Sequence, residues 1–306
     1  MIHHSKHHHI DSAFIYGLAV LSILALSNVE RILMHRVHKS VAIPQQKTEL
    51  SIFNKDAFSN VKIRGKAYVV YDIVGQKVIA GKNENTALPL ASLTKVMTAI
   101  TARSHYDRKS LITIRPSSMD EGYDLGLKNG QVWTLDELLK YTLVFSSNDG
   151  AQAIADGLVG RNAFVAQMNS DAVQMGLDLQ FTQPAGLDEG NKLGGKGSAL
   201  SAAKMMADAR KKFPEIFDAT TKTRATVTSS TGRVSGVPNT NQDVQNLLGI
   251  EASKTGYTDM AGGNLVVIVD ASLGHPVAIV VLGSTRESRF TDVEILYHAL
   301  QKSIVK

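Results

Sequence analysis

A serine and a lysine lie three residues apart at the start of a predicted helix, in the stretch LPLASLTKVMTAITA, residues 88–102. Residues three apart on a helix share a face, so the amine of Lys95 can reach the hydroxyl of Ser92. A hydroxyl attacks a carbonyl well only when a base takes its proton, and a neutral lysine can be that base. The stretch alone also fits a plainer interpretation, in which Ser92 or Thr94 caps the helix and Lys95 is solvated.

Two further short motifs carry polar groups that such chemistry needs. SSNDGA places Ser146 and Asn148 at the break between two predicted helices, and KTGYTDMAGG places Lys254, Thr255 and Gly256 on a predicted strand. Each motif alone is also typical of an ordinary turn or hairpin end. In this order, S-x-x-K, S-x-N and K-T-G form a set that supports acyl transfer through a serine nucleophile.

The electrostatics of this set explain why it contains two lysines. Lys95 can act as a base only when it is neutral, and burial or a like charge nearby lowers the pKa of a lysine. We expect Lys254 to supply that charge. A lysine suits this task because its pKa moves readily, whereas that of an arginine does not.

Composition limits the classes of function that remain. The chain has 306 residues, is 43% hydrophobic and 20% charged, and carries a formal net charge of +5, all ordinary for a globular protein. A mildly basic chain is compatible with an anionic envelope polymer, but no basic block with interleaved aromatics predicts nucleic-acid binding. The absence of cysteine excludes disulfides and thiolate metal sites. The tract MIHHSKHHH, residues 1–9, could bind a metal but is better explained as a chance polar cap. His105 and His298 have no histidine partner at ligand spacing, and we expect neither a metal nor a cofactor.

The N-terminal region contains an uncharged apolar run at residues 13–26. Its length lies between a signal-peptide core and a membrane-spanning helix, so we predict a signal peptide or membrane anchor over residues 1–30. The polar residues 31–61 are predicted to be a linker. More basic residues follow the apolar run than precede it, and the positive-inside rule would therefore keep the rest of the chain inside. This orientation conflicts with the location inferred below, and the sequence leaves the conflict open.

Residues 62–306 are predicted to form one catalytic domain. Two strand-like segments come first, then a run of helices, then three strand-like segments and a closing helix. This order predicts an α+β fold in which an antiparallel sheet is flanked by helices and an all-α lobe is inserted. A cleft between sheet and lobe is the natural place for a site.

With these motifs, the chain resembles the low-molecular-weight penicillin-binding proteins, which are serine-type D-alanyl-D-alanine carboxypeptidases and endopeptidases. The resemblance runs from about Lys62 to Lys306 and includes ALPLASLTKVMTA, LLKYTLVFSSNDGAQAIAD, PAGLDEGN, NTN, SKTGYTDMAGG and GSTRESRFTD. It implies a β-lactamase/DD-peptidase-like fold and action outside the cytoplasm, in the periplasm or cell envelope. The implied partners are peptidoglycan stem peptides ending in D-Ala-D-Ala, β-lactam antibiotics as inhibitors, and a membrane through the N-terminal segment.

The resemblance also implies a role for each motif residue. The catalytic residues would be Ser92, Lys95 and Ser146; the substrate-binding residues would be Asn148, Lys254, Thr255 and Gly256; and the oxyanion hole would be the backbone amides of Ser92 and Tyr257. Arg286 or Arg289 would support binding of the substrate carboxylate.

Three alternatives to a carboxypeptidase remain open. A D,D-endopeptidase of peptide cross-links uses the same residues. A class A β-lactamase also needs a glutamate that activates water for deacylation, and the loop FTQPAGLDEGN, residues 181–191, lacks that family's E-x-x-L-N although Glu189 lies in it. A penicillin-binding sensor would acylate but would not turn over.

Overall fold

The computed structural model describes residues 52–118, 127–272 and 274–305, and those from Ile52 onward form one compact unit. The predicted signal peptide or anchor lies outside the described residues, as does most of the predicted linker. The boundary predicted at residue 62 stays a prediction. Within the described ranges, no helix combines the length and apolar character needed to cross a bilayer.

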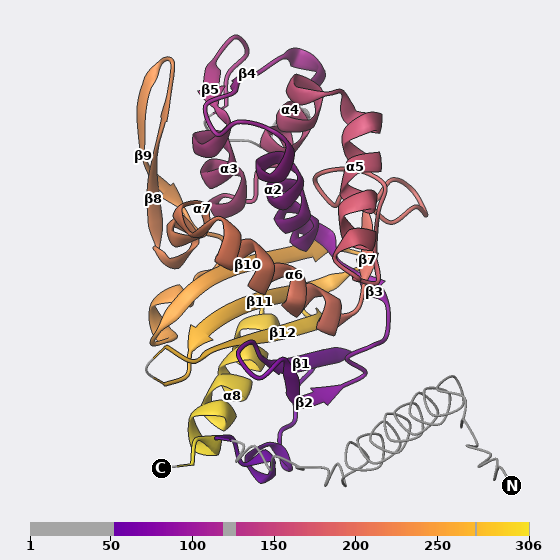
Figure 1. Cartoon of the computed structure of the whole chain (residues 1–306), viewed down its shortest axis with the longest axis vertical. Helices are drawn as coiled ribbons and strands as arrows, with labels where there is room; N and C mark the ends of the chain where they lie inside the picture. Colours follow the sequence, from indigo (N-terminus) through magenta and orange to yellow (C-terminus); the bar gives the residue numbers. More distant parts are fainter. Residues whose placement is uncertain (1–51, 119–126, 273, 306) are drawn as a thin grey trace, which may run out of the picture. The chain divides into compact units, whose positions relative to one another are not determined.

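The centre of this unit is a five-stranded antiparallel sheet in the order β10-β11-β12-β1-β2 (Figure 1). It combines an N-terminal hairpin with the last three strands of the chain. Its strands are β1 (Ala67–Asp72), β2 (Lys77–Lys82), β10 (Ile250–Thr258), β11 (Gly262–Asp270) and β12 (Pro276–Ser284). Strand β10, which carries the K-T-G motif, is therefore an edge strand whose outer side is free of a sixth strand in this sheet.

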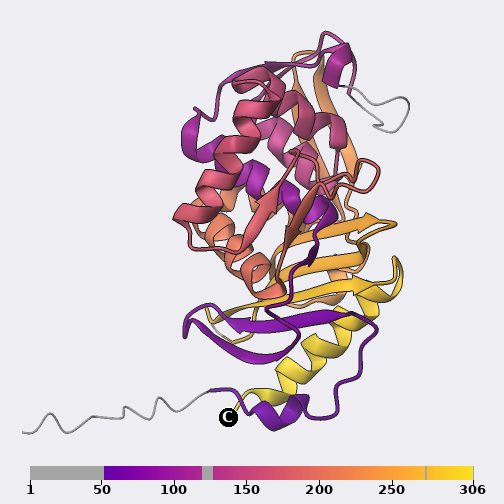
Figure 2. The same ribbon diagram turned by 90° about the vertical axis from the view of Figure 1, so that its right-hand side faces the viewer.

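Both faces of the sheet are covered, because alternate side chains of a strand point to opposite faces. On β11, Val266 and Ile268 pack into a core shared with α6 (Ala199–Lys212). Val267 lies on the opposite face of the sheet and packs into a second core, shared with α8 (Ser288–Ser303). Figure 2 shows the helical lobe on one side of the sheet and α8 on the other.

The lobe is built around α2 (Thr94–His105), whose residues from Thr94 to Ala102 are all buried. A helix buried on every side must lie inside other helices rather than on a surface. Its neighbours are α6 and the helices α3 (Leu135–Val144), α4 (Asn148–Leu158) and α5 (Arg161–Gln174).

Short elements complete the unit. The small sheets contain β3 (Leu88–Pro89), β7 (Gly195–Gly197) and β6 (Leu179–Phe181) in one, and β4 (Leu111–Thr113), β5 (Val132–Thr134), β8 (Arg224–Ser229) and β9 (Gly232–Pro238) in the other. The helical turns are η1 (Lys55–Phe58), η2 (Ala91–Leu93), η3 (Pro116–Ser118), α7 (Pro214–Phe217), η4 (Asp218–Thr221) and η5 (Val244–Asn246).

The predicted α+β class with an antiparallel sheet flanked by helices is confirmed. In detail, the inserted lobe is not purely helical, since it includes the two small sheets. Most of their strands have only two or three residues. These short segments cannot show an alternation of apolar and polar residues, so the sequence pattern missed them. The sequence prediction also missed β8 and β9, which have six and seven residues.

Candidate active site

The segment that carries Ser92 is held in a strained conformation. It runs from β3 through the turn η2 into α2, and Ala91 in that turn has a φ of 50°. A left-handed conformation costs a residue other than glycine about 1–3 kcal/mol and persists only where its surroundings impose it. One constraint is Gly186, where an added β-carbon would overlap the carbonyl oxygen of Ala91. Ser92 thus sits, half-buried, at the end of a backbone turn whose shape is imposed from outside.

The side chain of Lys95 is completely buried and its amine makes three hydrogen bonds. Its Nζ lies 2.8 Å from the Oγ of Ser92, 2.8 Å from the Oδ1 of Asn148 and 2.7 Å from the carbonyl oxygen of Ala185. The oxygens of Asn148 and Ala185 can only accept, whereas the Ser92 hydroxyl can also donate. A charged amine would donate to all three partners. A neutral amine would donate to two of them and could accept from the Ser92 hydroxyl, which is the arrangement that deprotonation of Ser92 requires.

Ser146 lies at the break between α3 and α4, in a second strained conformation with a φ of 63°. The break is stabilised by Ser147, whose hydroxyl accepts from the N–H of Gly150 at 2.7 Å and so caps α4. Asn148, the first residue of α4, can therefore reach Lys95 while Ser146 points to Lys254. Ala91 and Ser146 both have a left-handed conformation. Ala91 directly precedes the proposed nucleophile, Ser92, and Ser146 is itself a candidate catalytic residue.

Lys254 forms a second lysine–serine pair. Its Nζ lies 2.8 Å from the Oγ of Ser146 and 2.9 Å from the carbonyl oxygen of Thr255, and the residue is 1% exposed. Burial holds the pKa of Lys254 well below its usual range, and the positive charges of Lys95 and Arg289 lower it further. Like-charge repulsion therefore lowers the pKa of Lys254 too, whereas from the sequence we expected this effect only on the pKa of Lys95.

The K-T-G motif passes close to the nucleophile. A β-carbon added at Gly256 would lie 3.3 Å from the backbone nitrogen of Ser92 and 2.9 Å from the carbonyl oxygen of Leu90. Thr255 is buried and its hydroxyl donates to the Oγ1 of Thr240 at 2.6 Å. The residue after the motif, Tyr257, is exposed. The structure thus brings together all eight residues that the sequence singled out.

The two arginines that the sequence offered for carboxylate support differ in their surroundings. Arg289 is buried and its Nη1 donates to the carbonyl oxygen of Gly256 at 2.8 Å, while burial lowers its pKa to about 10. Arg286 is exposed, with its guanidinium 5.2 Å from the ring centre of Tyr257. Arg289 therefore holds the backbone of the motif strand, and Arg286 lies at the rim beside Tyr257.

Three participants were missed by sequence reasoning. They are the carbonyl of Ala185, the hydroxyl of Thr240 and the guanidinium of Arg289 as a backbone ligand. Ala185 and Thr240 do lie in the stretches PAGLDEGN and NTN, which carry part of the resemblance. Across the described residues, no group of three or more His, Cys, Asp or Glu side chains could hold a metal ion. The expectation of no metal and no cofactor stays a prediction.

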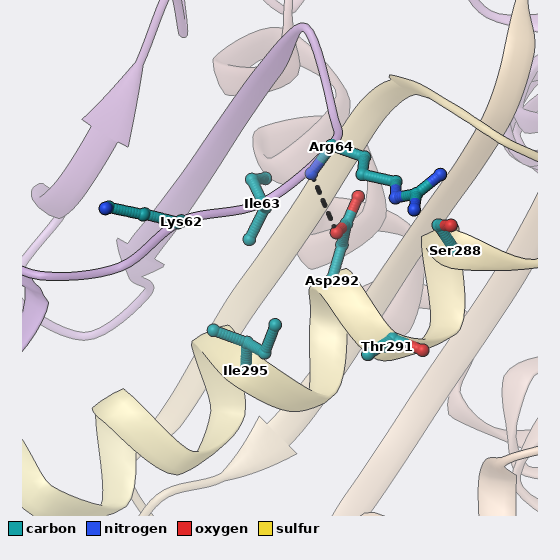
Figure 3. A pocket seen from close by; sticks show the side chains of 7 residues that line it. All are labelled: Lys62, Ile63, Arg64, Ser288, Thr291, Asp292 and Ile295. Atoms are coloured by element: carbon teal, nitrogen blue, oxygen red, sulfur yellow. Dashed lines mark hydrogen bonds between the residues drawn. The ribbon is translucent and has the colours of Figure 1, made fainter.

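Hollows elsewhere on the surface do not coincide with these residues. Figure 3 shows one between the chain before β1 and the start of α8, with a volume of about 450 Å³. Asp292 in it accepts from the backbone N–H of Arg64 at 3.0 Å, of Gly65 at 2.9 Å and from the hydroxyl of Ser284 at 2.6 Å. These bonds attach α8 to the sheet, so we assign this carboxylate a structural role.

Comparison with known proteins finds one family. The model of the peptidase S11 family, described as D-alanyl-D-alanine carboxypeptidase, matches residues 54–286. The chain is 31% identical over 201 residues to D-alanyl-D-alanine carboxypeptidase DacB2 of Mycobacterium tuberculosis, covering 64% of this chain and 67% of that protein. It is 28% identical over 244 residues to D-alanyl-D-alanine carboxypeptidase DacF of Bacillus subtilis, covering 77% of this chain and 61% of that protein.

An endopeptidase and a solved structure match as well. The D-alanyl-D-alanine endopeptidase of Escherichia coli is 30% identical over 233 residues, which is 73% of each chain. The ampicillin-bound structure of penicillin-binding protein D2 from Listeria monocytogenes superimposes with a TM-score of 0.69 at 25% identity, covering 79% of this chain and 98% of that one.

Proposed function

The chain belongs to the D-alanyl-D-alanine carboxypeptidase family of serine-type hydrolases, and from this premise we propose that it trims peptidoglycan stem peptides through an acyl-enzyme on Ser92. The observation that carries the proposal is a pair of buried lysine–serine contacts. Lys95 lies 2.8 Å from Ser92, and Lys254 lies 2.8 Å from Ser146. One pair activates a nucleophile and the other delivers a proton.

Acylation begins with proton transfer from Ser92 to Lys95. The freed Oγ attacks the carbonyl carbon of the penultimate D-alanine, and negative charge develops on the carbonyl oxygen. Two backbone N–H groups, those of Ser92 and Tyr257, would stabilise this oxyanion. The short distance between Gly256 and the Ser92 nitrogen supports this assignment, because it places the two backbone segments side by side.

The tetrahedral intermediate then collapses by breaking the peptide C–N bond. The leaving amine of the terminal D-alanine needs a proton, and Ser146, hydrogen-bonded to Lys254, would relay to it the proton that Lys95 took from Ser92, so that Lys95 is neutral again and Ser146 keeps its hydroxyl. Hydrolysis by water then releases the acyl group and restores the Ser92 hydroxyl.

Substrate binding would use the groups around β10. Lys254 and the hydroxyl of Thr255 would bind the terminal carboxylate, and Asn148 would bind the peptide backbone. The edge of β10, with which no other strand of this sheet pairs, would accept the substrate as an added strand. An arriving carboxylate favours the charged form of Lys254. Substrate binding would therefore shift Lys254 toward its charged form, and this charge helps to keep Lys95 neutral.

The structure also bears on the alternatives. The Escherichia coli relative supports the endopeptidase as second candidate, since it matches over the same domain. In the loop that a class A β-lactamase uses for its deacylating glutamate, Lys95 is bound by the Ala185 carbonyl, and Asp188 is engaged by the hydroxyl of Thr258 at 2.6 Å. These contacts favour a peptidase. We further propose that the enzyme acts outside the cytoplasm, carried there by its N-terminal segment, and that β-lactams inhibit it.

The test mixes the purified full-length chain with a fluorescent penicillin and measures intact mass, with Ser92→Ala alongside. D-alanine release from diacetyl-L-Lys-D-Ala-D-Ala is measured in parallel. A stable adduct absent from the variant, together with release of D-alanine, supports the proposal. An adduct without release on any peptide indicates a sensor, rapid penicillin hydrolysis indicates a β-lactamase, and neither adduct nor hydrolysis overturns the assignment of Ser92.

A further inference from the structure

The peptide group between Pro89 and Leu90 is held at both ends. Its carbonyl oxygen, on Pro89, accepts from the Nδ2 of Asn264 at 2.9 Å. Its N–H, on Leu90, donates to the carbonyl oxygen of Gly195 at 2.9 Å. A peptide group is planar and rigid, so two bonds at opposite ends fix its orientation. This peptide group lies one residue before the strained Ala91, so its orientation constrains where the turn that carries Ser92 begins.

Asn264 connects this peptide group to the strands on both sides of β11. The residue is completely buried, and its Oδ1 accepts from the N–H of Gly283 on β12 at 2.8 Å. Across the other side of β11, its Cα pairs directly with that of Gly256 on β10. The Asn264 side chain thus connects the segment before the nucleophile to β11 and β12, at the position where β11 pairs with Gly256 of the K-T-G strand.

We propose that Asn264 is a positioning residue that sets the distance between the two oxyanion donors, the amides of Ser92 and Tyr257. This inference rests on the proposed function, because it assumes that Ser92 is the nucleophile. One donor lies on the nucleophile segment and the other on β10. Their separation depends on how the segment is fixed against the sheet, and the Asn264–Pro89 bond is a direct link between the two.

The chemistry of the side chain explains why an amide stands here. The site needs one donor toward Pro89 and one acceptor for Gly283, and an asparagine side chain offers both in a short planar group. A buried apolar residue would leave the Pro89 carbonyl and the Gly283 N–H without these partners. The segment could then shift, and a displacement of about 1 Å at a reacting group can cost about 10²-fold in rate.

The informative variant is Asn264→Asp. In its ionised form this variant keeps the size of the side chain and the acceptor for Gly283, but replaces the donor toward Pro89 with an oxygen that repels the carbonyl. A protonated carboxyl would still donate to Pro89, so the acylation rate of the variant is followed across pH. The matched control is Asn169→Asp. Asn169 also donates its Nδ2 to backbone carbonyls, of Val165 and Phe181 at 2.9 Å each, and accepts from the Phe181 N–H at 2.9 Å, but it joins α5 to β6.

The experiment follows acylation of the full-length proteins by a fluorescent penicillin at several concentrations, which separates the non-covalent dissociation constant from the acylation rate constant. The fraction of titratable sites and the Tm are measured on the same samples. We expect Asn264→Asp to lower the acylation rate constant per titrated site roughly 10–100-fold, at a dissociation constant changed less than threefold. Asn169→Asp should lower only the Tm.

A loss of Tm or of titratable sites, with the rate constant per site unchanged, would show a merely structural Asn264 and overturn the inference. If Asn264→Asp does not fold, Asn264→Ser provides the same measurement, because its hydroxyl is too short to bridge to Pro89. Acylation of the wild-type protein distinguishes failure of this inference from failure of the proposed function. An adduct on wild-type Ser92 with normal acylation of the Asn264 variants removes only this inference, whereas no adduct on the wild type removes the proposed function and this inference with it.

Discussion

Ser92 and Gly256 approach so closely that a β-carbon on the glycine would lie 3.3 Å from the serine's backbone nitrogen. Gly256 does not have a positive φ, so its backbone conformation does not require a glycine. The glycine is there for space. The two residues come from opposite ends of the domain, and their contact defines the narrow gap in which a substrate carbonyl would meet both oxyanion donors.

The first prediction concerns this gap. Gly256→Ala adds a methyl group 2.9 Å from the carbonyl oxygen of Leu90, tighter than ordinary contact, so the strand and the nucleophile segment must separate. We expect acylation by a fluorescent penicillin to slow by about 10²-fold, as for a group displaced by about 1 Å. Gly81→Ala, on the exposed end of β2 where the added carbon meets only the flexible side chain of Glu84, is the steric control. Equal acylation rates for Gly256→Ala and wild type would mean that the gap is wider than the structure indicates.

The second prediction separates proton transfer from charge at Lys95. Lys95→Arg keeps a positive charge but cannot act as a base, since the guanidinium does not lose its proton. We expect acylation to fall by about 10²–10⁴-fold, equivalent to about 3–5 kcal/mol of barrier. Lys95→Ala should lose at least as much. The check is the single-turnover acylation rate constant, normalised to the folded fraction by circular dichroism. Near-normal acylation by the arginine variant would remove Lys95 from the role of base.

The proposed catalytic residues could be singled out from the sequence because they lie in short local motifs. Ser92 and Lys95 occupy one helical face, and Lys254, Thr255 and Gly256 are consecutive. The contacts that orient them could not be predicted in the same way. The carbonyl that binds Lys95 is 90 residues away, and Asn264 is 175 residues from the carbonyl it holds. No local pattern predicts such pairs, because they form only when segments far apart in the sequence pack together.

The same division applies to the fold. Long strands with a strong apolar pattern, such as β11 and β12, were predicted, and so was the closing helix α8. The sequence placed the start of the nucleophile helix near Ser92, whereas α2 begins at Thr94 after a tight turn. That turn depends on the left-handed Ala91, which is imposed by Gly186 and the surrounding loops rather than by the preference of alanine.

The third prediction is a dependence of stability on pH. Because the pKa of Lys254 is lowered in the folded protein, the unfolded chain binds more protons between that lowered pKa and about 10.5, the ordinary lysine value. The stability that Lys254 contributes is therefore fully present above about pH 10.5 and is lost as pH falls through the lowered pKa. Relative to Lys254→Met, the wild type should gain up to about 1.4 kcal/mol of unfolding free energy per pH unit in this window.

Urea unfolding of both proteins from pH 6 to pH 10 measures this difference. Lys204→Met, on the exposed side of α6, is the control and should show no such slope. A difference between wild type and Lys254→Met that stays constant with pH would mean that Lys254 titrates in the folded protein as it does in the unfolded chain. Lys95 and Lys254 titrate as a coupled pair. A pH dependence of the unfolding free energy that is shallower and spread over more pH units therefore also agrees with the prediction.

The fourth prediction concerns residues before β1. Phe58 of η1 is 7% exposed and packs into the core between the sheet and α8, and Phe53 pairs its backbone with Ile304 at the other end of the chain. Removing a buried phenylalanine side chain typically costs about 3–5 kcal/mol. Phe58→Ala should therefore lower the unfolding free energy by about that amount, and urea unfolding measures it. Val74→Ala, at a residue 60% exposed, should change it by less than about 0.5 kcal/mol.

The Phe58 variant should nevertheless acylate normally per titrated site, because its core lies on the face of the sheet opposite the one that packs against Leu93 and α2. A loss below about 1 kcal/mol would instead place the start of the folded domain near residue 62, as the sequence predicted, with the residues before it acting as a linker. A full loss would place that start before Phe58, and a catalytic domain cut at residue 62 would then lack part of its own core.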